Sequence, residues 1–147
     1  MKKLLVFGLV AILLLPLLVL GCKKIEPSPP DTQAKTIELT LDDFSAQNNI
    51  VKDIQLTRPG SLIVSLGSNA STGYQWGEAE ISDATKVTQA SRNFLEPQTT
   101  LVGAAGKDVW TFDAKAAGTT TIKMSYGRPW EGGEKNAFTL TINVTVK

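Results

Sequence analysis

The alternation of apolar and polar residues at the C-terminal end constrains the fold of this chain most strongly. From Phe138 to Val146 every second side chain is apolar, and threonine or asparagine occupies the positions between. A period of two places successive side chains on opposite faces of a β-strand. The segment 137–146 is therefore predicted to be a strand with one face in a hydrophobic core.

Further segments upstream have the same β character and are separated by polar turns. They are residues 36–41, 50–56, 61–66, 75–79, 86–94, 109–114 and 119–126. From residue 36 onward no stretch carries a helical period over ten residues. Seven or eight short antiparallel strands predict an all-β chain with an immunoglobulin-like β-sandwich fold. Cys22 is the only cysteine, so no disulfide is expected and the core must rest on apolar packing.

Three connections in this pattern are long, and we name them loop one (67–76), loop two (96–106) and loop three (127–136). Successive connections in an antiparallel sandwich alternate between its two ends. One short turn separates loop one from loop two, and another separates loop two from loop three. The three loops are therefore expected at one end, which would form a single binding edge.

The N-terminus has the layout of an export signal. Lys2 and Lys3 precede an apolar stretch that runs from Leu4 to Leu20, as in a secretory signal peptide. A transmembrane anchor is the alternative, but about 17 residues that include Pro16 are at the short limit for crossing a bilayer.

The end of this stretch, Val19-Leu20-Gly21-Cys22, resembles the lipobox of bacterial lipoproteins. In those proteins the signal is cut before the cysteine and the thiol is diacylated. The resemblance implies a signal peptide over 1–21, a lipidated Cys22 with a proline-containing linker over 22–35, and a domain over 36–147. The protein is then expected in the cell envelope, held to a bacterial membrane by the lipid after export. A free reactive thiol is the alternative role for Cys22.

Composition argues against several functions. The chain has no histidine, which excludes Ser-His and Cys-His nucleophile pairs and histidine-based zinc sites. No spacing of carboxylates or lysines indicates catalysis, so we expect no enzyme, no metal and no cofactor. Removing the two lysines of the signal changes the net charge from +1 to −1. Without a clustered basic face, a nucleic-acid partner is not expected.

Loop one combines turn chemistry with aromatic residues. Its glycines can adopt positive φ, and its polar side chains can hydrogen-bond their own backbone. These residues are Gly67, Asn69, Ser71, Thr72 and Gly73. Trp76 is expected to be buried at the start of the next strand, and Tyr74, which has the same parity, to be partly buried.

Loops two and three flank it in the sequence. The small residues 103–106 let a backbone approach a partner closely, or simply make a mobile connection, and both interpretations stay open. In loop three, Pro129 fixes its own φ and favours an extended Arg128. Arg and Trp are frequent at interface hot spots. Trp130 is expected to be exposed beside glycines, and the alternative is a Trp folded back with Arg128 stacked over it.

Together the three loops resemble those of chagasin-type inhibitors of papain-like cysteine proteases. Residues 69–76 (Asn-Ala-Ser-Thr-Gly-Tyr-Gln-Trp) are similar to that family's Asn-Pro-Thr-Thr-Gly-Tyr-x-Trp motif. Residues 103–106 resemble its Gly-x-Gly-Gly loop, and residues 126–131 its Arg-Pro-Trp loop. The resemblance spans 36–147, and the departures are Ala70 for Pro, Ser71 for Thr and Ala105 for Gly.

The resemblance implies a monomeric, reversible, competitive inhibitor whose 69–73 tip enters the active-site cleft beside the catalytic cysteine. The loops 103–106 and 128–130 would clamp either side. The protease-binding residues it implies are Asn69, Ala70, Ser71, Thr72, Gly73, Tyr74, Gly103, Ala104, Ala105, Gly106, Arg128, Pro129 and Trp130. The alternative is a non-inhibitory, lipid-anchored binding module that contacts a glycan or an envelope protein through Arg128 and Trp130.

Overall fold

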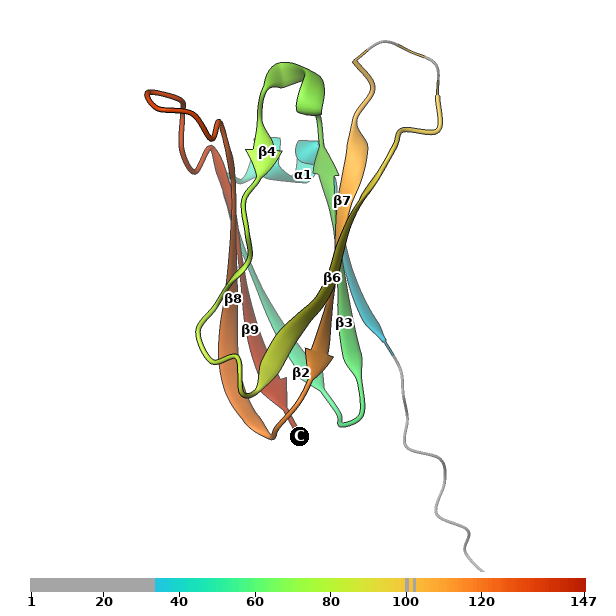
Figure 1. Cartoon of the computed structure of the whole chain (residues 1–147), viewed down its shortest axis with the longest axis vertical. Helices are drawn as coiled ribbons and strands as arrows, with labels where there is room; N and C mark the ends of the chain where they lie inside the picture. Colours follow the sequence, from blue (N-terminus) through green and yellow to red (C-terminus); the bar gives the residue numbers. More distant parts are fainter. Residues whose placement is uncertain (1–33, 100, 102) are drawn as a thin grey trace, which may run out of the picture.

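Two β-sheets face each other in the computed structural model, which describes residues 34–99, 101 and 103–147 (Figure 1). One sheet has the strand order β1-β3-β7-β6, and the other has the order β2-β9-β8-β4, with β5 paired to β8. In chain order the described strands are β1 (Lys35–Leu39), β2 (Asn49–Leu56), β3 (Ser61–Ser68), β4 (Gln75–Trp76), β5 (Glu80–Ile81), β6 (Val87–Leu95), β7 (Gly106–Ala114), β8 (Gly118–Gly127) and β9 (Phe138–Val146). The predicted signal segment and Cys22 lie outside the described residues.

The all-β, immunoglobulin-like sandwich is confirmed, but the strand pairing is not antiparallel throughout. β1 runs parallel to β3, and β2 runs parallel to β9. The other described pairs are antiparallel. Nine strands are present in the described residues rather than seven or eight. The alternation of a strand encodes which face is buried and not which strand lies beside it, so the parallel pairs were missed.

A short helix, α1 (Leu41–Ala46), replaces the polar turn expected after β1. Thr40 and Asp43 form a capping box, in which the Thr40 N–H donates to Asp43 Oδ2 at 2.7 Å and the Asp43 N–H donates to Thr40 Oγ1 at 3.3 Å. The Thr40 backbone N–H, and after it the Thr40 hydroxyl, donate to the Asp43 carboxylate and lower the pKa of Asp43. Phe44 is fully buried and anchors the helix to the core. Six residues are too few to show a helical period in the sequence.

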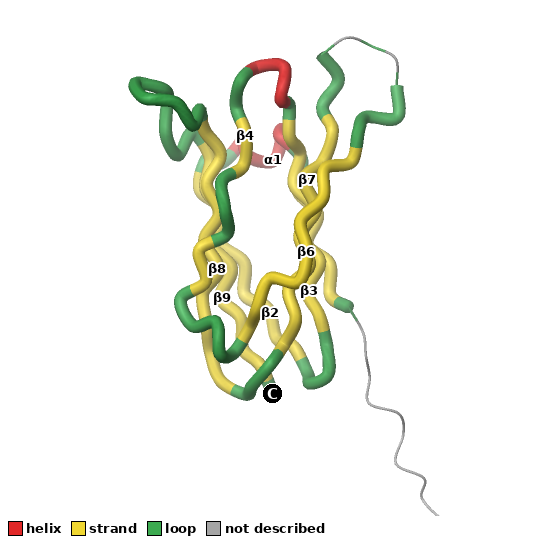
Figure 2. The backbone as a smooth tube through the Cα atoms, viewed as in Figure 1, coloured by secondary structure: helices red, strands yellow, loops and turns green. Residues whose placement is uncertain are grey.

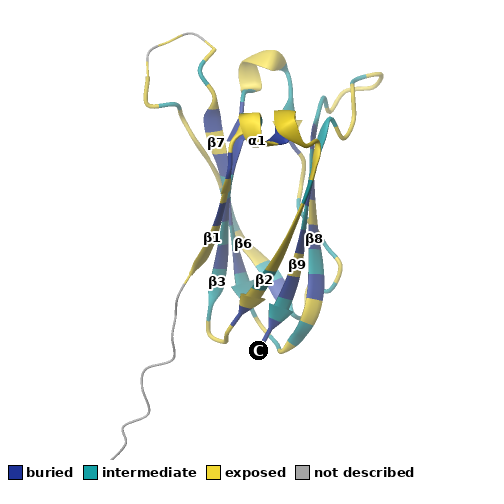
Figure 3. Ribbon diagram, turned by 180° about the vertical axis from the view of Figure 1, so that it is seen from behind, coloured by how far each residue is buried: buried dark blue, intermediate teal, exposed yellow. Residues whose placement is uncertain are grey.

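A cluster of aromatic rings fills the core below α1. The Trp76 ring lies 5.1 Å from Phe44 and 5.1 Å from Tyr126, between ring centroids. Trp76, Trp110 and Phe112 are all buried, as the strand parity predicts. Buried positions alternate along the strands (Figure 3). Aromatic packing of this kind stabilises a core that has no disulfide.

The three long loops emerge at the same end of the sandwich, at the top of Figure 2. The short turns between β2 and β3 and between β7 and β8 lie at the other end (Figure 1). The expected clustering is confirmed. Within the described part of the chain, helices are too short and too polar to cross a bilayer.

Candidate functional site

Loop one is shorter and more ordered than the sequence suggests. β3 continues to Ser68 and β4 starts at Gln75, so the connection covers only residues 69–74. Its tip is a single 3-10 turn, η1 (Ala70–Thr72). Gly67 lies inside β3, whereas Gly73 closes the turn with a φ of 79°. Only Gly73 therefore uses the conformational freedom expected of both glycines.

Asn69 organises the tip. Its Oδ1 accepts from the Ser71 N–H at 3.2 Å and from Ser71 Oγ at 2.6 Å. The Asn69 carbonyl accepts from the Thr72 N–H at 3.2 Å and from Thr72 Oγ1 at 2.7 Å. The Gly73 N–H donates to the Ala70 carbonyl at 3.1 Å. These bonds give the tip one compact conformation, because most of its polar groups are satisfied within the loop.

The base of loop one is fixed to the core. Trp76 Nε1 donates to the Gly67 carbonyl at 2.9 Å, across the two legs of the loop. The Asn69 N–H donates to the Tyr126 hydroxyl at 3.1 Å. Trp76 is 1 % exposed, so it anchors the loop and is not itself at the edge.

Arg92 fixes the outgoing leg from the opposite sheet. Its Nη2 donates to the Trp76 carbonyl at 2.7 Å and lies 3.3 Å from Asp108 Oδ1. Its Cζ lies 4.8 Å from the centre of the Trp110 ring. No local pattern predicts this contact, because Arg92 and Asp108 meet only once β6 and β7 have paired.

Loop two is joined to the tip through one side chain. Asn69 Nδ2 donates to the Gly103 carbonyl at 3.0 Å. Gly103 and Ala105 are exposed, Ala104 is half-buried, and Gly106 is buried as the first residue of β7. Ala105 does not have a positive φ, so its departure from Gly costs no backbone strain.

Loop three lies against loop one on the other side. The Arg128 Cζ lies 4.4 Å from the centre of the Tyr74 ring and 5.7 Å from that of Trp130. Trp130 is 51 % exposed, as expected. The same ring also crosses Gly73, where an added Cβ would lie 2.6 Å from Trp130 Cη2. The two interpretations of Trp130 thus both hold in part, because it is exposed and also packed on the neighbouring loop.

Tyr74 is half-buried, as predicted, and its hydroxyl donates to Glu134 Oε2. This hydrogen bond raises the pKa of Tyr74, with burial adding to the effect, because both favour the neutral phenol. Glu134 lies outside the motif that the sequence singled out. Its role was missed because nothing local pairs residue 134 with residue 74.

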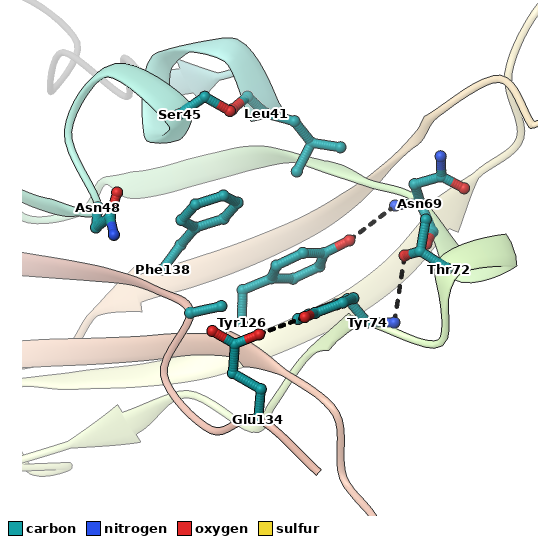
Figure 4. A pocket seen from close by; sticks show the side chains of 10 residues that line it. Leu41, Ser45, Asn48, Asn69, Thr72, Tyr74, Tyr126, Glu134 and Phe138 are labelled. Atoms are coloured by element: carbon teal, nitrogen blue, oxygen red, sulfur yellow. Dashed lines mark hydrogen bonds between the residues drawn. The ribbon is translucent and has the colours of Figure 1, made fainter.

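A pocket of about 400 Å³ opens behind loop one, between η1 and α1 (Figure 4). The stacked rings of Tyr74, Tyr126 and Phe138 form one wall. Leu41 and Asn69 approach from α1 and loop one. Glu134 also lines the pocket, which hollows this end of the sandwich beside α1.

Exposed apolar side chains gather at the same end. Among the described residues the exposed large hydrophobics include Phe94, Leu95 and Leu101 around loop two, and Trp130 in loop three. Apolar groups on the loops that flank a polar tip are typical of a protein-binding surface. The residues that the structure describes contain no group of three or more acidic, histidine or cysteine side chains that could hold a metal.

The comparisons with known proteins define the family to which this chain belongs. Residues 56–144 match the model of the chagasin family peptidase inhibitor I42, so the chain belongs to this family. The match confirms the resemblance of the three loops to those of chagasin-type inhibitors. Because the family consists of protease inhibitors, the expectation that the chain is not an enzyme is confirmed as well.

Two relatives show how close the similarity is. Chagasin from Trypanosoma cruzi is 30% identical over 87 residues, which cover 56% of this chain and 79% of the relative. Amoebiasin-2 from Entamoeba histolytica is 31% identical over 84 residues, which cover 57% of this chain and 68% of the relative. Neither relative supports a non-inhibitory binding module.

Solved structures agree in fold. The crystal structure of the cysteine protease inhibitor EhICP2 from Entamoeba histolytica superposes with a TM-score of 0.58 at 24% identity, over 77% of this chain and 97% of that one. The structure of PbICP-C in complex with falcipain-2 gives a TM-score of 0.59 at 20% identity, over 78% and 100%. At these identities the likeness establishes the sandwich.

Proposed function

We propose that this protein is a reversible, competitive inhibitor of papain-like cysteine proteases and that residues 69–73 enter the active-site cleft. The observation that carries the proposal is the ordered tip of loop one, flanked by two loops at one end of a chagasin-family domain. The similar protein PbICP-C is described in complex with falcipain-2, and EhICP2 is described as a cysteine protease inhibitor. These descriptions favour the same class of target here.

The folded tip explains how a peptide loop can occupy a protease without being cut. A substrate binds as an extended strand, with its scissile carbonyl open to the catalytic thiolate. In η1 the carbonyls of Asn69 and Ala70 instead accept hydrogen bonds from Thr72 and Gly73. Extending the tip would break these bonds and detach the Asn69 side chain from Ser71. The tip therefore fills the cleft without presenting a scissile bond in reactive geometry.

Preorganisation also favours affinity. A loop that is already ordered loses little conformational entropy when it docks. Loop one meets this condition through Trp76 and Asn69. Trp130 and Gly103–Ala105 would then contact the two walls of the cleft, with the aromatic ring supplying the largest apolar surface.

Steady-state kinetics with papain and a soluble form beginning at Lys23 test the proposal. A competitive inhibitor raises the apparent KM of a peptide substrate and leaves kcat unchanged. Trp130→Ala is expected to raise Ki about 30-fold, the effect of losing a hot-spot aromatic side chain. Val51→Ala is the control, since Val51 is an exposed apolar residue on β2 and lies outside the three loops. A non-competitive pattern, or equal effects of the two variants, would contradict the proposal.

We further propose that the inhibitor is monomeric and is anchored through lipid on Cys22 to a bacterial membrane after export. The support is the sequence pattern of residues 1–35, divided at Cys22 into a signal and a linker. Metabolic labelling with palmitate should mark the wild-type protein in the membrane fraction and leave Cys22→Ser unlabelled. Labelling of Cys22→Ser would overturn the assignment. Light scattering of the form beginning at Lys23 measures its molar mass and so tests whether it is monomeric.

A further inference from the structure

We infer that Lys135 is a positioning residue that holds Trp130 in its binding orientation. The inference rests on the proposed function and adds a residue outside the three motifs that resemble the family. Lys135 follows the glycines of loop three, and its side chain folds back over the loop.

The contacts of Lys135 bracket the Arg-Pro-Trp segment. Its Nζ donates to the Arg128 carbonyl at 2.7 Å and to the Trp130 carbonyl at 2.8 Å. Pro129 lies between these two carbonyls and has no N–H of its own. One ammonium group thus fixes the backbone on both sides of the proline.

Backbone hydrogen bonds complete the arrangement around Lys135. The Arg128 N–H donates to the Glu134 carbonyl at 2.7 Å, and the Gly133 N–H donates to the Trp130 carbonyl at 3.1 Å. Asn136, directly after Lys135, has a φ of 54° and is the one non-glycine residue with positive φ in the described part of the chain.

The ammonium group suits this position. A lysine has three donors and no acceptor, and charged donors make stronger hydrogen bonds than neutral ones. Among the described residues no carboxylate lies within ion-pair distance of Lys135. Its two close partners are therefore carbonyl groups of the segment that carries Trp130.

Trp130 transmits this restraint to loop one. The ring crosses Gly73, at the end of η1. Glu134, next to Lys135, accepts the hydroxyl of Tyr74. Two consecutive residues of loop three therefore act together. Glu134 bonds directly to loop one, and Lys135 holds the backbone that carries Trp130. Lys135 acts on protease binding through Trp130 and not by contact with the protease.

Three variants test the inference by titration of papain. Lys135→Met is expected to raise Ki about tenfold, because two charge-assisted hydrogen bonds are lost while the apolar stem is kept. Lys135→Arg should return Ki to within about threefold of the wild type, since a guanidinium also donates to carbonyls. Lys123→Met is the matched control, because Lys123 is an exposed lysine on β8, and its Ki should stay within about twofold.

A double-mutant cycle separates positioning from a general loss of stability. In the Trp130→Ala background, Lys135→Met should change Ki by less than about twofold, since the side chain it positions is absent. An equal loss in both backgrounds would overturn the inference, and so would a wild-type Ki for Lys135→Met. The thermal midpoint of Lys135→Met should lie within about 2 °C of the wild type. A larger fall would assign Lys135 a structural role instead.

A measurement on the free protein distinguishes failure of this inference from failure of the proposed function. Trp76 and Trp110 are buried, so acrylamide quenches mainly the fluorescence of Trp130. Lys135→Met should increase the quenching constant, and Lys135→Arg should restore it. If the wild type does not inhibit papain but the quenching changes as expected, the proposed function fails and the positioning role stands. Unchanged quenching in Lys135→Met would contradict the positioning role.

Discussion

Loop one leaves β3 and loop two leads into β7, and the described parts of the two loops are hydrogen-bonded differently. β3 and β7 are antiparallel neighbours, and Ser68 pairs with Gly106 at the point where both loops depart. Loop one is closed by hydrogen bonds that Thr72, Gly73 and Trp76 donate, and by one that Asn69 Oδ1 accepts from Ser71. In the described part of loop two, the Ala104 N–H donates to the Leu101 carbonyl at 3.3 Å and the Leu101 N–H donates to Thr99 Oγ1 at 3.3 Å. The Asn69 side chain adds a bond from loop one to the Gly103 carbonyl. In loop one, side chains that bond back to the backbone restrain the tip.

The difference suggests a division of roles. An ordered tip suits insertion into a narrow cleft, since little entropy is lost on docking. A flank that presents the small, exposed residues Gly103 and Ala105 suits close contact with the rim of the cleft.

The largest effect is expected where both loops use a glycine with positive φ. Gly73 and Gly103 have φ values of 79° and 82°, but only Gly73 has Trp130 in the space that a Cβ would occupy. Gly73→Ala should raise Ki about a hundredfold, from a backbone cost of about 1–2 kcal/mol and a displaced hot-spot ring. Gly103→Ala should raise Ki only about tenfold or less, because its only cost is the strain of a positive φ at alanine. Similar Ki values for the two variants would contradict the proposed order of loop one.

Asn69→Ala should weaken inhibition by about tenfold, as for the loss of a capping side chain. The substitution removes the acceptor for Ser71 and the donor to Gly103. Asn93→Ala, an exposed asparagine on β6, is the matched control and should keep the wild-type Ki. Hydrogen exchange should show faster exchange at Ser71 in Asn69→Ala, and unchanged exchange there would indicate that Asn69 does not order the tip.

Tyr74→Phe should raise Ki about threefold, since an exposed hydrogen bond to Glu134 is lost. The raised pKa of Tyr74 also predicts a pH effect on stability. The native state retains the phenol proton at pH values where the unfolded chain has released it, so this contribution is complete below about pH 10 and is lost as the pH rises through the raised pKa. A titration of phenolate absorbance should place one tyrosine above the ordinary range in the wild type and nearer to it in Glu134→Gln. Identical titrations would refute the link between Tyr74 and Glu134.

The smallest effect is expected at Ala70, where the family motif has proline. Ala70 is the first residue of η1 and donates no backbone hydrogen bond in the turn. Proline is favoured at this position because its φ is already set. Ala70→Pro should therefore lower Ki about twofold through a stiffer unfolded loop. If Ala70→Pro inhibits more weakly, the turn needs a backbone conformation that proline cannot adopt.

Much of the fold was accessible from the sequence because burial follows local periodicity. The parity of Trp76 and Trp110 predicted their burial, and the alternation of short and long connections placed the three loops together. The parallel pairing of β1 with β3 and of β2 with β9 was not accessible from the sequence. It depends on how α1 carries the chain from one sheet to the other. Gly67 was assigned to the loop although it continues β3.

The site was only partly predictable for a related reason. Turn chemistry identified Asn69 and Gly73, because their roles begin within the loop itself. The contacts of Glu134 and Lys135 depend on how loop three folds back, and that geometry has no local signature. The family motifs identify which segments lie at the edge, and the side chains that order those segments became visible only in the folded chain.

The most direct test of the central claim is a titration of papain with the form beginning at Lys23, followed by mass spectrometry after prolonged incubation. The account predicts stoichiometric inhibition at submicromolar concentration, with the chain between Asn69 and Tyr74 still intact when it is recovered from the complex. No inhibition at micromolar concentration, or cleavage within that tip, would contradict it.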